Sequence, residues 1–178
     1  MRKTLFSLTG VIALALTLSA CGPQQAEVTE ESQPGTTATT TASAEPTTSE
    51  VNATPKFGDT VTYPDGLKIT VKDLGEFEPS ETAAGNEGGT PHQIEITVEN
   101  GTDNPVDPNL LHATASSGGK ESNQIFDSEA GLNGAPTTTV LPGKSVTWIE
   151  GYAFADPDDV TFEIFIFDAG HDSVIYTR

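Results

Sequence analysis

Alternation of apolar and polar residues over the C-terminal part of the chain constrains its fold more than any other sequence feature. In residues 67–72 (LKITVK) and 94–99 (IEITVE), every second side chain is apolar and the others are polar. A strand places successive side chains on opposite faces of a sheet, so this period of two predicts half-buried β-strands. No window of useful length shows the apolar spacing of an amphipathic helix. We therefore expect an all-β protein.

Turn residues separate the predicted strands. Pro-Asp-Gly at 64–66, Glu-Asn-Gly-Thr-Asp at 99–103 and Pro-Gly at 142–143 lie between such stretches. Tight turns favour these residue types. Further strands are predicted over 60–63, 110–115, 122–126, 145–154, 160–167 and 173–177. Seven to nine short antiparallel strands at this spacing predict one β-sandwich domain over residues 56–178.

One long segment of this region lacks a strand pattern. Residues 78–91 are rich in Gly and Glu and contain few apolar side chains. Such a composition is typical of connecting segments that run over the surface. We therefore predict a long, mobile loop here.

Several motifs follow one another in an order that resembles a known family. They are Gly-Asp-Thr at 58–60, the stretches 67–71 and 94–100, Leu-Pro-Gly-Lys at 141–144 and Gly-Tyr-Ala-Phe at 151–154. Together they resemble the immunoglobulin-like extracellular domain of unknown function that is common in Gram-positive lipoproteins and immunoprotective secreted antigens. The resemblance covers about residues 57–177 and implies an immunoglobulin-like antiparallel β-sandwich, a surface location and no established catalysis. The Cys…Trp…Cys pattern of antibody domains is missing, so Trp148 is not interpreted as their core tryptophan.

The N-terminus has the layout of an export signal. Arg2 and Lys3 give a positive start, and residues 5–18 form an uncharged, mostly apolar run. A bilayer span needs about 20 apolar residues, whereas a shorter run suits the central region of a signal peptide. Residues 1–20 are therefore predicted to be a signal peptide.

The signal ends in Leu18, Ser19, Ala20 and Cys21, which resemble the lipobox of bacterial lipoproteins. The resemblance implies that the Cys21 thiol receives a diacylglyceryl group and that cleavage makes Cys21 the mature N-terminus. Two acyl chains hold a protein on a membrane more firmly than one. We therefore expect the chain at the extracytoplasmic face of the cell membrane. An ordinary secretory signal with a chance cysteine is the alternative.

Residues 21–55 are predicted to form the lipidated N-terminus and a disordered linker. Positions 22–55 contain no aromatic residue, Lys or Arg, and Thr, Glu, Pro and Ser are abundant. Such a segment cannot bury enough apolar surface to offset the entropy of ordering it. As a flexible coil it would reach roughly 30–35 Å. Its Thr, Ser and Pro content also suits O-glycosylation.

The charge and the single cysteine restrict the classes of partner and fold. The formal net charge is −18, and loss of the two cations Arg2 and Lys3 gives −18 − 2 = −20 for the mature chain. This charge argues against nucleic acid, which needs clustered Lys and Arg, and against a domain lying on anionic lipid. Cys21 is the only cysteine, so no intramolecular disulfide can form. We expect a monomer that depends on its apolar core.

The sequence carries no complete catalytic motif. Gly-Lys-Ser at 143–145 resembles the end of a phosphate-binding loop, but Thr138 stands where that loop needs its first glycine. A nucleophile elbow and a zinc-protease helix motif are both missing. The three histidines have no short metal-ligand spacing. We therefore expect neither enzymatic activity nor a cofactor.

An acidic turn is the first candidate binding site. Asp156, Asp158 and Asp159 lie together between two predicted strands, beside a proline. Carboxylate oxygens are the ligands that Ca²⁺ prefers. The turn is therefore either a cation site or a solvated connection.

A break in the strand alternation is the second candidate. In residues 160–167 one face is apolar throughout, while the other begins polar and ends with Phe165 and Phe167. Either a covering segment lies over these two rings, or they form an exposed aromatic patch for a protein or ligand.

These observations leave several functions open. The favoured one is a membrane-anchored surface lipoprotein with a non-catalytic immunoglobulin-like domain that binds a protein, a cell-wall polymer or a small molecule. The alternatives are a lipoprotein that binds cations or small solutes through its acidic loops, an enzyme with a loop-borne site, and a spacer. An exposed apolar patch, converging carboxylates, or a pocket with perturbed titratable groups would distinguish the first three.

Overall fold

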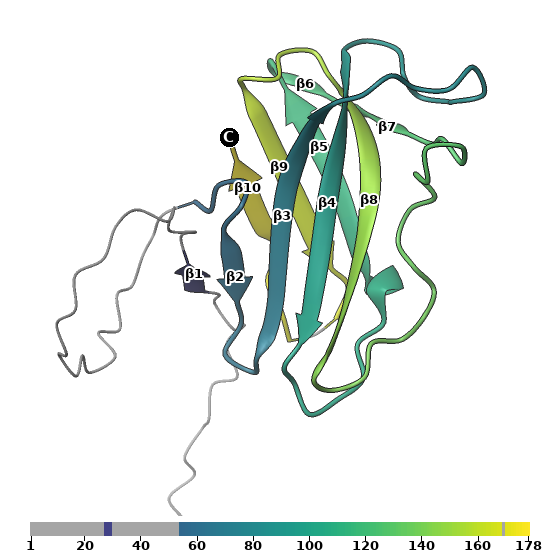
Figure 1. Ribbon diagram of the computed structural model, residues 1–178. Coiled ribbons are helices and arrows are strands. Elements are labelled where there is room, and N and C mark those ends of the chain that lie inside the picture. Colours follow the sequence, from purple (N-terminus) through teal and green to yellow (C-terminus); the bar gives the residue numbers. More distant parts are fainter. Residues whose placement is uncertain (1–26, 30–53, 169) are drawn as a thin grey trace, which may run out of the picture.

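The computed structural model describes residues 27–29, 54–168 and 170–178, which form two antiparallel sheets packed face to face (Figure 1). The larger sheet has the spatial order β1 (Glu27–Thr29), β2 (Thr60–Thr62), β3 (Leu67–Glu76), β4 (Thr90–Asn100), β8 (Lys144–Phe154) and β7 (Asn123–Ile125). The smaller sheet has the order β10 (Val174–Thr177), β9 (Val160–Ile166), β5 (Leu111–Ser117) and β6 (Lys120–Glu121). The predicted all-β sandwich is confirmed.

The described residues contain ten strands, against the predicted seven to nine. The two-residue strand β6 was not predicted, and neither was β1, which lies in the segment predicted to be a linker. β1 pairs antiparallel with β2, with Val28 opposite Val61. The predicted signal peptide, the lipobox and most of the linker lie outside the described residues. No helix within the described ranges is long and apolar enough to cross a membrane; one 3₁₀ turn, η1 (Pro108–Leu110), precedes β5.

The core lies between the inner faces of the two sheets. β4 pairs with β8 over eleven residues, from Thr90 opposite Phe154 to Asn100 opposite Lys144. Because alternate residues point inward, the apolar positions of each strand meet in one cluster: Leu67, Ile69, Val71, Ile94, Ile96, Val98, Phe154, Phe162 and Ile164 are among its most buried members. Burial of these side chains on both sheets is what the period of two in the sequence predicts.

The three tyrosines of the chain all connect the two sheets. Each hydroxyl donates to a main-chain carbonyl oxygen of the opposite layer or of the loop that leads into it. The pairs are Tyr63 with Asp172 at 2.7 Å, Tyr152 with Ala113 at 3.2 Å, and Tyr176 with Ile69 at 2.7 Å. Burial raises the pKa of all three phenols above the ordinary value of 10.0.

The connection between β3 and β4 spans residues 77–89, close to the loop predicted over 78–91, and contacts with the residues that follow β7 anchor it. β4 already begins at Thr90, and Ala84 forms a bridge with Phe126, which follows β7. The Asp127 carboxylate accepts hydrogen bonds from the Ser80 backbone N–H at 2.7 Å and from the Ser80 hydroxyl at 2.8 Å. These contacts hold the connection against the end of the larger sheet. The sequence could not predict them because the partners lie far apart along the chain.

A second, smaller apolar cluster lies beneath this connection. Ile125, Leu132 and Ala153 are buried there, and Phe77 and Ala83 pack against them. The outer face of the larger sheet is therefore covered near β7 and the end of β8.

Candidate functional site

The outer face of the smaller sheet carries a group of large side chains, which we call the aromatic face. β9 contributes Glu163 and Phe165, and Phe167 directly follows this strand. Cross-strand pairing places His112 of β5 opposite Phe165, and Ile175 of β10 opposite Glu163. The aromatic face is defined by Leu110, His112, Glu163, Phe165, Phe167 and Ile175.

Exposure decides between the two interpretations of the phenylalanines. Phe167 is 64% exposed, so no described segment covers its ring, whereas Phe165 is half-buried among its neighbours. Ile175 and Leu110 are 41% and 42% exposed. Phe167 is therefore an exposed ring and Phe165 a partly covered one, and the role of the two rings in binding stays a prediction.

The strand framework holds this face in place. The Phe167 backbone N–H donates to the Leu110 carbonyl oxygen at 2.8 Å, which extends the β5–β9 ladder by one residue. The rings of Phe167 and His112 lie 6.4 Å apart between centroids, at 37°. On the inner side of β9, Phe162 and Ile164 are buried in the core. The aromatic side chains thus extend from a backbone that is anchored on its other face.

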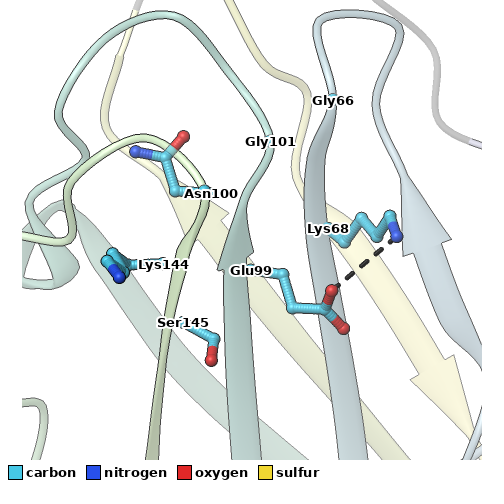
Figure 2. Close-up of a pocket in the computed structure, with 8 residues that line it drawn as sticks. Gly66, Lys68, Glu99, Asn100, Gly101, Lys144 and Ser145 are labelled. Carbon is cyan, nitrogen blue, oxygen red and sulfur yellow. Dashed lines mark ion pairs between the residues drawn. The ribbon is translucent and has the colours of Figure 1, made fainter.

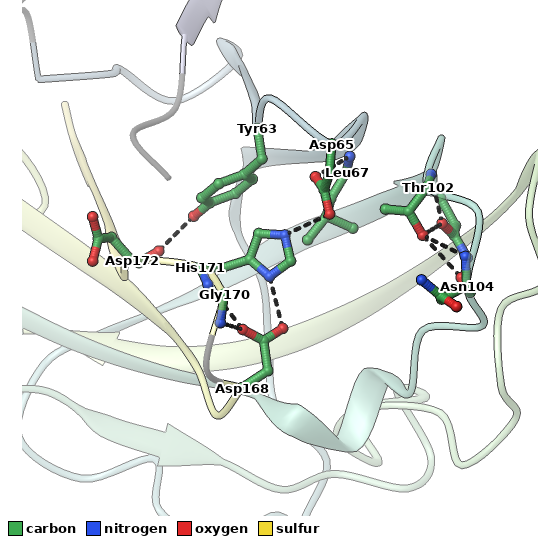
Figure 3. Close-up of polar contacts among 10 residues, drawn as sticks. Tyr63, Asp65, Leu67, Thr102, Asn104, Asp168, Gly170, His171 and Asp172 are labelled. Carbon is green, nitrogen blue, oxygen red and sulfur yellow. Dashed lines mark hydrogen bonds and ion pairs between the residues drawn. The ribbon is translucent and has the colours of Figure 1, made fainter. Parts of the chain in front are cut away.

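A histidine bridge lies at the end of the sandwich, where the β2–β3 turn meets the β9–β10 loop (Figure 3). His171 Nδ1 lies 2.7 Å from Asp168 Oδ2, and its Nε2 lies 3.0 Å from Asp65 Oδ2. Both contacts can be hydrogen bonds to ionised carboxylates only when both ring nitrogens carry protons. The Tyr63 ring meets the imidazole edge-on at 4.8 Å between centroids. The bridge ties the loop after the aromatic face to the opposite sheet.

Asp168 is adapted to this bridge. Burial raises the pKa of its carboxyl, but hydrogen bonds from the Gly170 N–H and from His171 outweigh burial and leave the pKa below its ordinary value. No sequence pattern indicated this bridge, because Asp65 lies 106 residues before His171.

A second histidine, His92, is buried near the start of β4. His92 Nδ1 lies 3.0 Å from Asp73 Oδ1, and Arg178 forms an ion pair with the same carboxylate. Burial lowers the pKa of His92, and the negative charge of Glu76 opposes this effect. The neutral ring can then donate from Nδ1 to Asp73, while Nε2 has no partner among the described residues. These contacts link Arg178 to β3, at the point between Asp73 and Gly75 where the register of β3 with β4 shifts.

Glu150 is a buried carboxylate on the inner face of β8. It accepts hydrogen bonds from Trp148 Nε1 at 2.9 Å, the Tyr152 hydroxyl at 2.9 Å and Gln124 Nε2 at 3.2 Å. These three donors satisfy a group that would otherwise be costly to bury. Its role in the structure is to connect β8 with β7 through side chains.

A small pocket of about 180 Å³ opens beside the β2–β3 turn (Figure 2). Its lining consists of Gly66, Lys68, Glu99, Asn100, Gly101, Gly143, Lys144 and Ser145. The backbones of Gly66 and Gly101 approach so closely that a Cβ on Gly66 would lie 2.6 Å from the Gly101 carbonyl oxygen. Within the pocket, Lys68 and Glu99 form an ion pair at 3.7 Å. The glycines therefore serve the close approach of two turns.

Of the two interpretations of Asp156, Asp158 and Asp159, the structure favours a solvated connection. All three side chains are exposed in the β8–β9 turn, and Asp156 Oδ1 accepts from the Asp158 backbone N–H at 3.1 Å. Across the described part of the chain, no group of three or more His, Cys, Asp or Glu side chains could hold a metal ion. Proximity in sequence does not bring these carboxylates onto one point, because the turn directs them outward.

Comparisons with known proteins bear on the fold. No protein-family model matches the chain, and no curated protein matches it. The crystal structure of the yjhA protein from Bacillus subtilis is similar to it, with a TM-score of 0.54 and 15% sequence identity. The match covers 69% of this chain and 98% of that chain. At this identity the likeness shows a shared fold, and the resemblance to the immunoglobulin-like extracellular family stays a prediction.

Proposed function

We propose that this chain is a membrane-anchored surface lipoprotein whose sandwich is a non-catalytic binding module. The aromatic face is the observation that carries the proposal. Phe167 exposes 64% of its surface beside the exposed Ile175 and Leu110. Large exposed apolar patches on soluble domains are commonly interaction sites.

The geometry of the aromatic face suits a docking surface. An aromatic ring buries roughly 150–250 Å² when covered, so Phe167 offers a partner a large contact area. The backbone hydrogen bond from Phe167 to Leu110 and the buried inner side of β9 hold the backbone in one conformation before a partner binds. A preordered surface loses little conformational freedom on binding, which favours affinity.

The location rests on the N-terminal sequence. The lipobox at Leu18–Cys21 and the preceding signal support lipid attachment at Cys21 and display outside the membrane. The resemblance to the immunoglobulin-like lipoprotein domain supports the same assignment. A protein or a cell-wall component is then the partner within reach of the domain.

The anchor is tested by lipid labelling in the native host. The full chain should incorporate labelled fatty acid, whereas Cys21→Ala should incorporate none and should accumulate as precursor or appear in the medium. Ser80→Ala, in the folded domain, serves as a control that keeps the label. Normal labelling of the Cys21 variant would refute lipid attachment there.

The binding surface is tested by photo-crosslinking on intact cells. A photoreactive residue in place of Phe167 should capture a specific envelope component, and the same residue in place of Leu141 should not. Leu141 is 57% exposed and lies outside the aromatic face, so it is a matched control. Equal capture from both positions would mean that the aromatic face is not the binding surface.

A further inference from the structure

The charge pattern of the smaller sheet differs from that of the larger one. The sequences of β5, β9 and β10 are LHATASS, VTFEIFI and VIYT, so Glu163 is their single acidic residue, and they contain no Lys or Arg. Glu163 lies at one end of the aromatic face, opposite Thr114 on one side and Ile175 on the other. The Glu163 carboxylate therefore has Phe165 and Ile175 as apolar neighbours, and these three strands supply no Lys or Arg beside it.

Carboxylates on the larger sheet are arranged otherwise. Glu99 and Glu95 of β4 lie opposite Lys68 and Lys72 of β3 in the cross-strand register. These pairs balance charge within the sheet. Glu163 lacks such a counterpart, because the residues opposite it are Thr114 and Ile175.

The Glu163 side chain is oriented by one contact within the domain. The Ser173 hydroxyl donates to its Oε1 at 3.0 Å. Among the described residues, no cation forms an ion pair with Glu163. Phe165 lies two residues further along the same outward row of β9. The carboxylate is thus held in position beside an aromatic ring.

We infer that the aromatic face binds an arginine-bearing apolar segment of a protein partner. Arginine fits because its planar guanidinium can pair with Glu163 and also stack on an aromatic ring such as Phe165. Apolar side chains flanking the arginine then cover Phe167 and Ile175. The net charge of −20 on the mature chain favours approach of a basic partner.

This inference rests on the proposed binding function and narrows its partner. A cell-wall glycan is the competing occupant, because sugars also stack on aromatic rings. The aliphatic side chains of Leu110 and Ile175 favour the protein segment, since branched side chains offer no flat surface for a sugar ring. The phenylalanines likewise lack hydroxyl groups that could bond sugar oxygens.

Binding of a defined peptide tests the inference. The probe is a short peptide of alternating leucine and arginine, and its matched control carries citrulline, an uncharged isostere of arginine. Calorimetry with the full mature chain should show the arginine peptide binding at least about tenfold more tightly than the citrulline peptide, because charged pairs contribute that much or more when enclosed.

Variants of the chain locate the effect. Glu163→Gln keeps the shape of the side chain and should weaken binding of the arginine peptide about tenfold while leaving the citrulline peptide unchanged. Phe167→Ala should weaken both peptides. Glu121→Gln, on the exposed strand β6 of the same sheet, should change neither. Thermal melting of each variant verifies that the domain stays folded.

Each alternative result has a defined meaning. Equal effects of Glu163→Gln and Glu121→Gln would show that general negative charge attracts the peptide and would overturn the inference. Binding of purified cell-wall glycan that depends on Phe167, with no binding of the arginine peptide, would also overturn it. If crosslinking at position 167 captures a partner whose binding ignores Glu163→Gln, the inference fails and the proposed function stands.

Discussion

The outer faces of the two sheets share one strand geometry and differ in chemistry. On the larger sheet, Lys68 lies opposite Glu99, and the hydroxyls of Thr97 and Thr147 bond to each other at 2.9 Å. On the smaller sheet, the corresponding outward positions hold Phe165 and Ile175. The first face completes its polar interactions within the domain, whereas the second leaves apolar surface uncovered. The difference is the observation on which the proposed binding surface rests.

The largest expected effect separates the inner from the outer side of β9. Phe162→Ala removes a fully buried ring that packs on Phe57 and Tyr152, and should cost about 3–5 kcal/mol of unfolding free energy. Phe167 directly follows β9 and its side chain is exposed, so Phe167→Ala should change the free energy of unfolding by less than about 0.5 kcal/mol. Urea denaturation measures both. A similar loss in both variants would mean that Phe167 belongs to the core.

The next effect concerns the tyrosines that connect the two sheets. Because burial raises their pKa values above 10.0, the folded state keeps phenolic protons that the unfolded state loses at alkaline pH. Their contribution is therefore complete below pH 10.0 and is lost as the pH rises above it. Tyr176→Phe should cost about 0.5–1.5 kcal/mol at neutral pH. The stability of this variant should also fall less steeply than that of the unaltered chain as the pH rises above 10.0. An unchanged slope would contradict the role of the phenol.

A smaller, local effect is expected at Asp127, which anchors the β3–β4 connection through hydrogen bonds from Ser80. Backbone hydrogen bonds, led by that from Ser80, hold the pKa of Asp127 below its ordinary value of 3.8. The stabilisation is therefore present above pH 3.8 and is lost as the pH falls through the lowered value. Asp127→Ala should speed amide hydrogen exchange at Ser80 and Ala130 and leave β9 unchanged. Asp158→Ala, in an exposed turn, is the control; faster exchange throughout the domain would show a global role.

The smallest effect belongs to the charged pairs on the larger sheet. Lys68 and Glu99 are 3.7 Å apart and both side chains are exposed to solvent. A double-mutant cycle with Lys68→Gln and Glu99→Gln should give a coupling of about 0.2–1 kcal/mol that decreases in high salt. A coupling well above this range would mean that the polar face stabilises the sandwich more than solvent-exposed pairs do.

The sequence predicted most strands because one face of each is buried. The period of two in 67–72 and 94–99 reflects side chains that alternate between core and solvent, and such a pattern is local. β1 was not predicted, because its three residues pair with β2 through backbone groups and such pairing produces no pattern in the amino-acid composition. The hydrogen bonds that anchor the β3–β4 connection were not predicted for another reason: Asp127, which accepts them, lies 47 residues after Ser80.

The candidate sites divide in the same way. Phe165 and Phe167 were recognisable because they break an alternation, which is a local signal. The histidine bridge was not, because its two carboxylates come from separate loops. For Asp156, Asp158 and Asp159 the sequence left a cation site and a solvated turn open, and their exposure in the structure favours the solvated turn. Exposure and convergence depend on the packing of distant elements, so sequence patterns alone do not determine them.

The tyrosine contacts also have a mechanical consequence. In the function proposed above, the N-terminal tether would hold the larger sheet, while a partner on the aromatic face would pull on the smaller one. Tension between membrane and partner then acts to part the two layers. The hydroxyl bonds of Tyr63, Tyr152 and Tyr176 cross that plane at separate points. The chain itself crosses it in the β4–β5, β6–β7 and β8–β9 connections. Force between the two layers would thus be distributed over several parallel links.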